Sequence, residues 1–186
     1  MKATQVLRDE HEGILAMLAV VETAAKRLQS GKAIPSDLMT NAVGFFRNFA
    51  DQCHHGKEED ALFPALERHG IPKQGGPIGV MLAEHDQGRA FIRTMSDAAD
   101  KYARGDKTAA PALAQNMLGY VNLLRQHIAK ENNVLFPMAD QVLADAEQDK
   151  LYEAFEHIET TRTGPGEHER YHAMIAEYQK IAASWN

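Results

Sequence analysis

Residues 54–64 read HHGKEEDALFP, and residues 127–137 read HIAKENNVLFP. Both stretches place a glutamate four residues after a histidine, and both begin Leu-Phe-Pro four residues after that glutamate. The two stretches are 73 residues apart at the histidine, at the glutamate and at the proline. The sequence therefore contains two copies of one unit.

A second pair of histidines extends this repeat. The dipeptide Glu-His occurs at residues 10–11 and again at residues 84–85, which is 74 residues later. Apolar residues lie three and four positions from each of these histidines, and such neighbours share one face of an α-helix. Both side chains should therefore point into a helical core. A period this long differs from that of open solenoids and indicates two helical hairpins closed into one pseudo-twofold bundle.

The remaining sequence predicts helices and no sheet. Hydrophobic periodicity and helix-breaking residues predict helices over residues 4–29, 36–69, about 77–104, about 108–146, 149–160 and 167–183. Four long helices with short connections form an all-α, up-down-up-down four-helix bundle. We expect this bundle over residues 1–146, with the two shorter C-terminal helices over residues 147–186 packed on it. Proline in each Leu-Phe-Pro should kink its helix just beyond the glutamate.

Size and charge exclude several classes of protein. The 186 residues suit one compact domain. Lys and Arg number 20 against 26 Asp and Glu, and no basic cluster stands out, so nucleic acid and anionic membranes are not expected partners. Charges at residues 8–12 interrupt the region where a signal peptide would be apolar, and residues 14–21 are too short an apolar run to span a bilayer. With a single cysteine, Cys53, a cytoplasmic protein is expected.

The repeated glutamates indicate a metal pair. A carboxylate on an apolar helix face is unfavourable unless a cation compensates it, and two such groups repel each other. Histidine and glutamate at i, i+4 on facing helices could give two ions bridging carboxylates and imidazole ligands. Nitrogen and oxygen ligands without thiolate favour iron, manganese or zinc. The expected ligands are the repeated residues His11, His54, Glu58, His85, His127 and Glu131.

This pattern resembles the hemerythrin-like, or HHE cation-binding, proteins over about residues 4–146. The resemblance implies a non-haem di-iron centre with an oxo or hydroxo bridge, in which Glu58 and Glu131 join the two irons and the histidines complete their coordination. Respiratory hemerythrins carry a fifth histidine four residues after the counterpart of His85. This chain has Arg89 there, which argues against simple reversible dioxygen carriage.

The C-terminal sequence from His168 to His172 reads HERYH and leaves three interpretations open. HExxH is also the motif of zinc proteases, with Glu169 as general base, but residues near the chain end leave no room for a catalytic domain. The second interpretation is an ordinary surface helix. The third is a helix that packs across the open end of the bundle and supplies His168 or His172 as an additional metal ligand.

Other residues near the motifs have two possible roles each. Glu10 and Glu84 precede a ligand histidine directly, so they either contact the ligands or remain solvated. Tyr120 lies on the face of His127 and either reaches the metals or packs in the core. His55 is one residue out of register with Glu58 and is expected to face elsewhere. His69 and His157 are expected to be exposed near helix ends.

Two functions follow from this interpretation. The first is a di-iron protein that binds or senses dioxygen, nitric oxide or iron. The second is a redox enzyme that decomposes peroxide or reduces nitric oxide during oxidative or nitrosative stress. The expected partners are a small diatomic ligand or peroxide and a redox protein; the metal loaded and the oligomeric state stay open.

Two related classes rank lower. The metal-site repair proteins of the family often carry a cysteine-bearing extension that has no counterpart before His11. Ferritin-like bundles use Glu-xx-His pairs on two helices, and here only Glu169 and His172 have that spacing.

Overall fold

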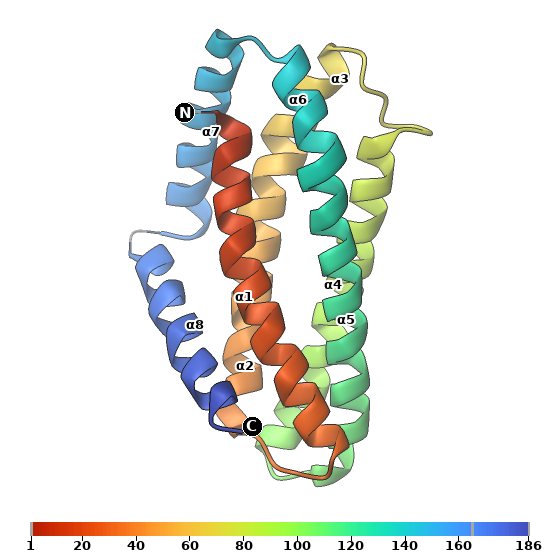
Figure 1. The fold of residues 1–186 in the computed structure, drawn as a ribbon, viewed down its shortest axis with the longest axis vertical. Helices are drawn as coiled ribbons and strands as arrows, with labels where there is room; N and C mark the ends of the chain where they lie inside the picture. The colour runs from red at the N-terminus through yellow and green to blue at the C-terminus, as the bar shows by residue number, and fades with distance from the viewer. Residues whose placement is uncertain (1, 165, 186) are drawn as a thin grey trace.

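The structure, a computed structural model, describes residues 2–164 and 166–185, and every regular element in these ranges is helical. Four long helical segments run side by side along the long axis, and two further helices lie beside them (Figure 1). The expected all-α bundle is thus confirmed. The first segment is α1 (Ala3–Gln29), and the second consists of α2 (Ser36–Phe45), η1 (Phe46–His55), η2 (Glu58–Leu62) and α3 (Phe63–Arg68). The third segment is α4 (Pro77–Ala103), and the fourth consists of η3 (Lys107–Ala109), α5 (Ala110–Lys130), η4 (Glu131–Leu135) and α6 (Phe136–Val142). The two further helices are α7 (Asp145–Arg162) and α8 (Glu167–Ala183).

Glycine ends the long segments at the positions that the sequence indicated. Gly31, Gly70 and Gly105 have φ angles of 75°, 82° and 94°. This left-handed conformation is strained for residues with a Cβ, and it reverses the chain after a helix. The connections are therefore short, and neighbouring segments are antiparallel.

One predicted boundary was wrong. The fourth segment ends at Val142 and does not continue to Ala146, because Leu143 and Ala144 are extended, with ψ angles of 118° and 157°. The carboxylate of Glu147 accepts a hydrogen bond from the Ala144 backbone N–H at 3.3 Å. This contact starts α7 at Asp145, four residues earlier than expected.

The second and fourth segments contain π-helical turns, which the periodicity did not predict. These turns include Glu58–Leu62 and Glu131–Leu135, and each ends one residue before a Phe-Pro pair. Proline has no N–H and its ring crowds the carbonyl four residues earlier. In the π-turns the N–H of Phe63 bonds to the carbonyl of Glu58, and the N–H of Phe136 bonds to that of Glu131, five residues earlier in each case. The structure therefore accommodates Pro64 and Pro137 by a wide turn just before each of them.

The helices α7 and α8 pack along the side of the bundle, against α1 and the second segment (Figure 1). Arg162 donates a hydrogen bond to the Gln52 carbonyl at 3.1 Å, and Asn41 donates to the Tyr178 hydroxyl at 2.6 Å. Of the three interpretations of the C-terminal helix, this packing agrees with the ordinary surface helix and not with a helix that crosses the open end of the bundle.

The apolar core is divided into two clusters along the bundle axis. In α1 one cluster ends at Leu7 and the other begins at Ile14, and in α4 the corresponding residues are Met81 and Ile92. The layer between the clusters contains the repeated histidines and glutamates. No helix among the described residues combines the length and apolar character that crossing a membrane requires.

Candidate metal centre

Seven ionisable side chains fill the layer between the two apolar clusters. They come from all four long segments, and each residue is at most 3% exposed: His11, His54, His55, Glu58, His85, His127 and Glu131. Such burial is rare for charged and imidazole groups unless they have partners. The structure thus brings together all six predicted ligands, and it adds His55.

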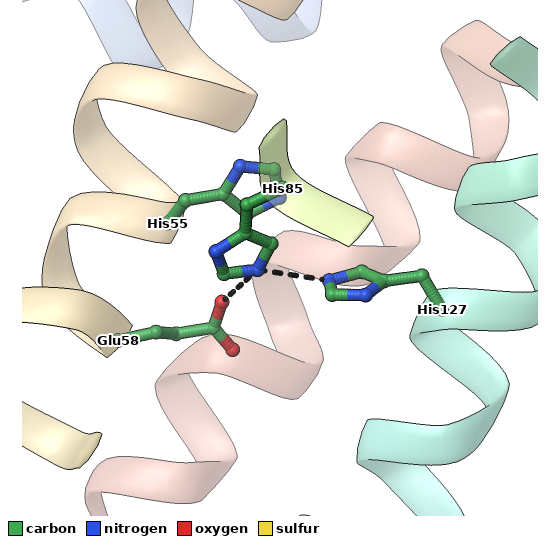
Figure 2. A group of neighbouring side chains, drawn as sticks. All are labelled: His55, Glu58, His85 and His127. Carbon is green, nitrogen blue, oxygen red and sulfur yellow. Dashed lines mark hydrogen bonds and ion pairs between the residues drawn. The ribbon is translucent and has the colours of Figure 1, made fainter. Parts of the chain in front are cut away.

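These side chains form two adjacent groups of potential metal ligands. One ligand atom from each member of a group lies within 4.8 Å of the others. The first group contains His55, Glu58, His85 and His127, which converge in Figure 2, and the second contains His11, His54, Glu58 and Glu131. Glu58 belongs to both groups, so two cations held here would be neighbours.

Both glutamates direct one oxygen toward each group. Glu131 places Oε1 3.1 Å from Nε2 of His127, and its Oε2 lies 3.3 Å from Nε2 of His11. Glu58 places Oε2 3.4 Å from Nε2 of His85, and its Oε1 lies 3.9 Å from Nε2 of His54. Each carboxylate therefore lies between the two groups, with one oxygen toward each of them.

The atoms that face the middle of the layer make ion-pair contacts with one another but no hydrogen bond of good geometry within the described residues. They are Nε2 of His11 and His54 and both carboxylate oxygens of Glu58 and Glu131. Leaving such groups buried and unsatisfied is costly. Cations would satisfy all of them, and nitrogen and oxygen donors without sulfur suit ions such as iron, manganese or zinc. The residues thus fit a pair of divalent ions.

His55 faces the interior, so the expectation that it faces elsewhere was wrong. Its ring stacks on that of His85, with centroids 3.8 Å apart (Figure 2). His54 and His55 both lie in the π-helix Phe46–His55. Each π-turn holds more residues than an α-turn, so successive side chains diverge less around the axis and both histidines point inward. The sequence signal for this additional histidine was the pair His54-His55, which is present only in the first copy of the repeat.

Burial lowers the pKa of His55 well below its usual value, and the positive charge of neighbouring histidines lowers it further. Its imidazole is therefore neutral at pH 7. Neutral imidazole is the form that binds metals.

The second nitrogen of each buried histidine contacts an acceptor outside the layer. The partners are a carboxylate in four cases and an amide oxygen in one. The distances from Nδ1 are 2.8 Å for His54 and Glu10, 3.3 Å for His55 and Asp51, 2.7 Å for His85 and Glu59, 3.0 Å for His127 and Glu84, and 3.0 Å for His11 and Asn132. An acceptor at Nδ1 holds the proton there and leaves Nε2 free to bind a cation.

The repeat extends to these outer contacts. Glu10 contacts Lys57, which precedes Glu58, and Glu84 contacts Lys130, which precedes Glu131. The two halves differ in burial, because Lys57 is fully buried whereas the Lys130 side chain is 40% exposed. Glu10 and Glu84 are thus contacts of the histidines and not solvated charges.

The first of these outer contacts is extended by α7. Glu159 of α7 also accepts a hydrogen bond from Lys57, at 2.8 Å. The helix α7 therefore contacts the outer residues of the first half of the centre.

Arg89 occupies the position of the fifth histidine of respiratory hemerythrins without joining either group. Its Nε lies 2.8 Å from the Asp51 carboxylate and its Nη2 lies 2.5 Å from the Glu59 carboxylate. These two carboxylates contact His55 and His85. Arg89 thus holds the acceptors that orient two histidines of the first group.

The carboxylates of the layer attract positive charge. Burial lowers the pKa of His127, but Glu131, Glu84 and Glu58 outweigh it and raise the pKa to about 10. Burial also raises the pKa of Glu131, but His127 and His11 hold it well below the usual range. Protons therefore occupy this layer when no metal does, and metal ions must displace them.

His168 and His172 belong to neither group. Nδ1 of His168 lies 3.6 Å from the Glu159 carboxylate, its side chain is 39% exposed, and its ring meets the edge of Phe49. The rings of His168 and His172 are 4.8 Å apart. The structure therefore places both histidines on the outside of the bundle, away from the predicted ligands.

The chain matches the hemerythrin HHE cation-binding domain over residues 2–139. It belongs to this family. As a hemerythrin-family protein it has relatives in several bacteria. It is 28% identical over 178 residues to an uncharacterized protein of Mycobacterium tuberculosis. The matched stretch covers 96% of this chain and 69% of the relative. A protein of Mycobacterium bovis matches to the same extent.

A second kind of relative is the iron-sulfur cluster repair protein YtfE of Escherichia coli. The identity is 28% over 139 residues, which cover 70% of this chain and 60% of YtfE. Family membership supports a cation-binding protein, and the layer of histidines and glutamates is its candidate site.

Proposed function

We propose that this hemerythrin-family protein holds two iron ions and uses them to bind or sense a small ligand such as dioxygen or nitric oxide, or to sense iron itself. The observation that carries the proposal is the orientation of Glu58 and Glu131. Each carboxylate directs one oxygen to each of two adjacent ligand groups. A single ion would not require two bridges.

Each of the two ions would have its own set of histidine ligands. His55, His85 and His127 would hold one ion, and His11 and His54 would hold the other. Glu58 and Glu131 would join them, as the family resemblance implies. Iron, when bound, supplies the redox-active electrons and the exchangeable coordination position that a diatomic ligand needs.

The surroundings support binding of small uncharged ligands. Apolar clusters lie on both sides of the layer along the bundle axis. Such surroundings keep bulk water away and strengthen the electrostatic interactions inside the layer. We place this function in the cytoplasm, because the only cysteine, Cys53, is free and buried, as is usual in a reducing compartment.

A second candidate is a redox enzyme of oxidative or nitrosative stress defence, which would decompose peroxide or reduce nitric oxide. The similarity to YtfE, whose name refers to iron-sulfur cluster repair, favours a protective role of this kind. Reduction of nitric oxide would also require electrons from a redox partner.

The test is metal content per chain, measured by mass spectrometry, together with absorption spectra of the reduced protein. Two irons per chain are expected, with loss of both in the variant that combines Glu58→Gln and Glu131→Gln. Spectra after addition of dioxygen, nitric oxide or peroxide separate the two candidates, since a binder gives a stable, reversible change and an enzyme consumes the reagent. One zinc per chain, retained in the double variant, would refute the proposal.

A further inference from the structure

Tyr120 carries a buried hydroxyl that the metal-binding layer does not explain. The residue is 0% exposed, and its hydroxyl has no hydrogen-bond partner within the described residues. Other tyrosines of the core are satisfied: the Tyr102 hydroxyl accepts from the Ile34 N–H at 3.3 Å, and the Tyr178 hydroxyl donates to Asp37 at 3.2 Å. A phenylalanine would fill the same space without an unsatisfied oxygen, whose burial is unfavourable.

The ring of Tyr120 extends toward the metal-binding layer. Tyr120 is seven residues before His127 on α5, which is two helical turns, or about 10 Å along the axis. Its Cε2 atom, however, lies 3.7 Å from the position that a Cβ of Gly88 would occupy. Gly88 is only three residues from His85, or about 4.5 Å along α4. Since Nε2 of His85 and Nε2 of His127 are 3.1 Å apart, the two histidines lie at one level, and the Tyr120 ring ends about one turn from it.

The surroundings of the ring hold it in place without binding its oxygen. The ring meets Phe46 edge-on at 4.7 Å and Phe91 at 6.5 Å between centroids. Burial raises the pKa of Tyr120, and the negative charge of Asp51 raises it further. Asp51 contacts His55 of the first ligand group. The phenol therefore stays protonated and can donate one hydrogen bond.

We propose that Tyr120 is a ligand-binding residue of the centre, whose hydroxyl donates a hydrogen bond to the terminal acceptor atom of a small ligand held by the metal pair. The inference rests on the proposed function. Because the ring ends about one turn from the level of His85 and His127, a ligand of two or three atoms held in the layer would be near enough to accept this hydrogen bond. The residue would then stabilise bound dioxygen, nitric oxide or a small anion relative to the empty centre.

The experiment uses azide, a small anion whose far nitrogen accepts hydrogen bonds. Azide is titrated into the iron-loaded wild-type protein and into the Tyr120→Phe and Tyr102→Phe variants, with iron content measured in each. We expect the dissociation constant for azide to rise about tenfold in Tyr120→Phe, as for loss of one hydrogen bond to a charged acceptor. The azide absorption band should also shift. Tyr102→Phe, which removes a buried hydroxyl at the far end of the bundle, should leave both quantities unchanged.

A second measurement separates this role from a structural one. The melting temperature of the metal-free Tyr120→Phe variant should equal or exceed that of the metal-free wild type, because the substitution removes an unsatisfied buried hydroxyl. A fall of several degrees would show that the hydroxyl has a partner within the protein and would overturn the inference.

Unchanged azide affinity in iron-loaded Tyr120→Phe would overturn the inference about Tyr120 alone. Failure of the iron-loaded wild-type protein to bind azide would overturn the proposed function together with it.

Discussion

The imidazole of His55 stacks on that of His85 with 14° between the ring planes. Both rings lie in the first ligand group with Glu58 and His127. The centre therefore has five histidines, one more than its repeat contains. The fifth histidine comes from η1, whereas α4 carries Arg89 at the position where respiratory hemerythrins carry theirs.

Replacing His55 with alanine should weaken one of the two ions selectively. Loss of a direct ligand should lower the affinity of the first group by at least about 100-fold, the upper end of what loss of an outer contact costs. Iron content after dialysis should therefore fall from two ions to about one per chain. The control is His157→Ala, since this histidine is exposed on α7. Two tightly held ions in His55→Ala would show that this ring packs beside the centre without binding metal.

Replacing Arg89 with alanine should act on the same ion from outside. Without its guanidinium, Asp51 and Glu59 lose the contacts that hold them against His55 and His85. Affinity for one ion should fall about 10–100-fold, which competition with a chelator of known affinity would measure. Arg93→Ala, one turn further along α4 and exposed, is the matched control. Equal metal affinities of the two variants would mean that the histidines are oriented without Arg89.

Metal removal should destabilise the protein. Binding to the folded state alone adds stability that grows with the ratio of free ion to dissociation constant, about 2.7 kcal/mol at a hundredfold excess. A chelator should therefore lower the melting temperature of the wild type. The variant with Glu58→Gln and Glu131→Gln should melt at the same temperature with and without the chelator. A chelator effect of equal size in both proteins would place the metal elsewhere.

The contact between Glu159 and His168 predicts a pH-dependent docking of α8. The contact with His168 lowers the pKa of Glu159 to about 2, with burial opposing it and Lys57 assisting it. The same contact raises the pKa of His168 above 6.5. The lowered carboxyl pKa stabilises the fold above pH 4.5, and this contribution is lost as pH falls toward about 2. The raised histidine pKa stabilises the fold below pH 6.5, and this contribution is lost as pH rises through the raised value.

The stability difference between wild type and His168→Gln should therefore be largest between about pH 4.5 and 6.5. Urea unfolding of the metal-free proteins at pH 3, 5.5 and 9 measures it. His172→Gln, which replaces the exposed histidine one turn away, serves as the control. A difference that is constant with pH would show that the contact makes no ionic contribution.

Gly119 allows α5 to pack against Phe91. A Cβ at this position would lie 2.6 Å from one ring atom of Phe91, so Gly119→Ala must displace the ring. Overpacking typically costs about 1–3 kcal/mol, and the better helix propensity of alanine returns up to about 1 kcal/mol. We expect a net loss of about 1 kcal/mol in the free energy of unfolding. Gly44→Ala, whose Cβ would meet nothing within 4 Å, should instead be neutral or stabilising.

The sequence alone determined the bundle and six of the seven ionisable side chains of its central layer. Helical periodicity indicated the four long segments, because burial of an apolar stripe is decided locally along each helix. The repeat identified the two glutamates and the histidines as equivalent positions that lie at the same level along the bundle axis. Residues at the same level of antiparallel helices lie close together. The prediction of carboxylate-bridged ions stays a prediction, but it names six residues that the structure gathers in one layer.

Only the tertiary structure decided how His55, Arg89 and the C-terminal helices are used. His55 turns inward because η1 is π-helical, and residue periodicity assumes the α-helical turn. Arg89 and Glu159 act through partners 30 to 102 residues away in the sequence, and no local pattern reveals such distant contacts. The pair His168 and His172 has the spacing of metal ligands, but α8 packs on the outside of the bundle. Spacing within a helix thus determines which side chains share a face, whereas packing between helices determines what that face meets.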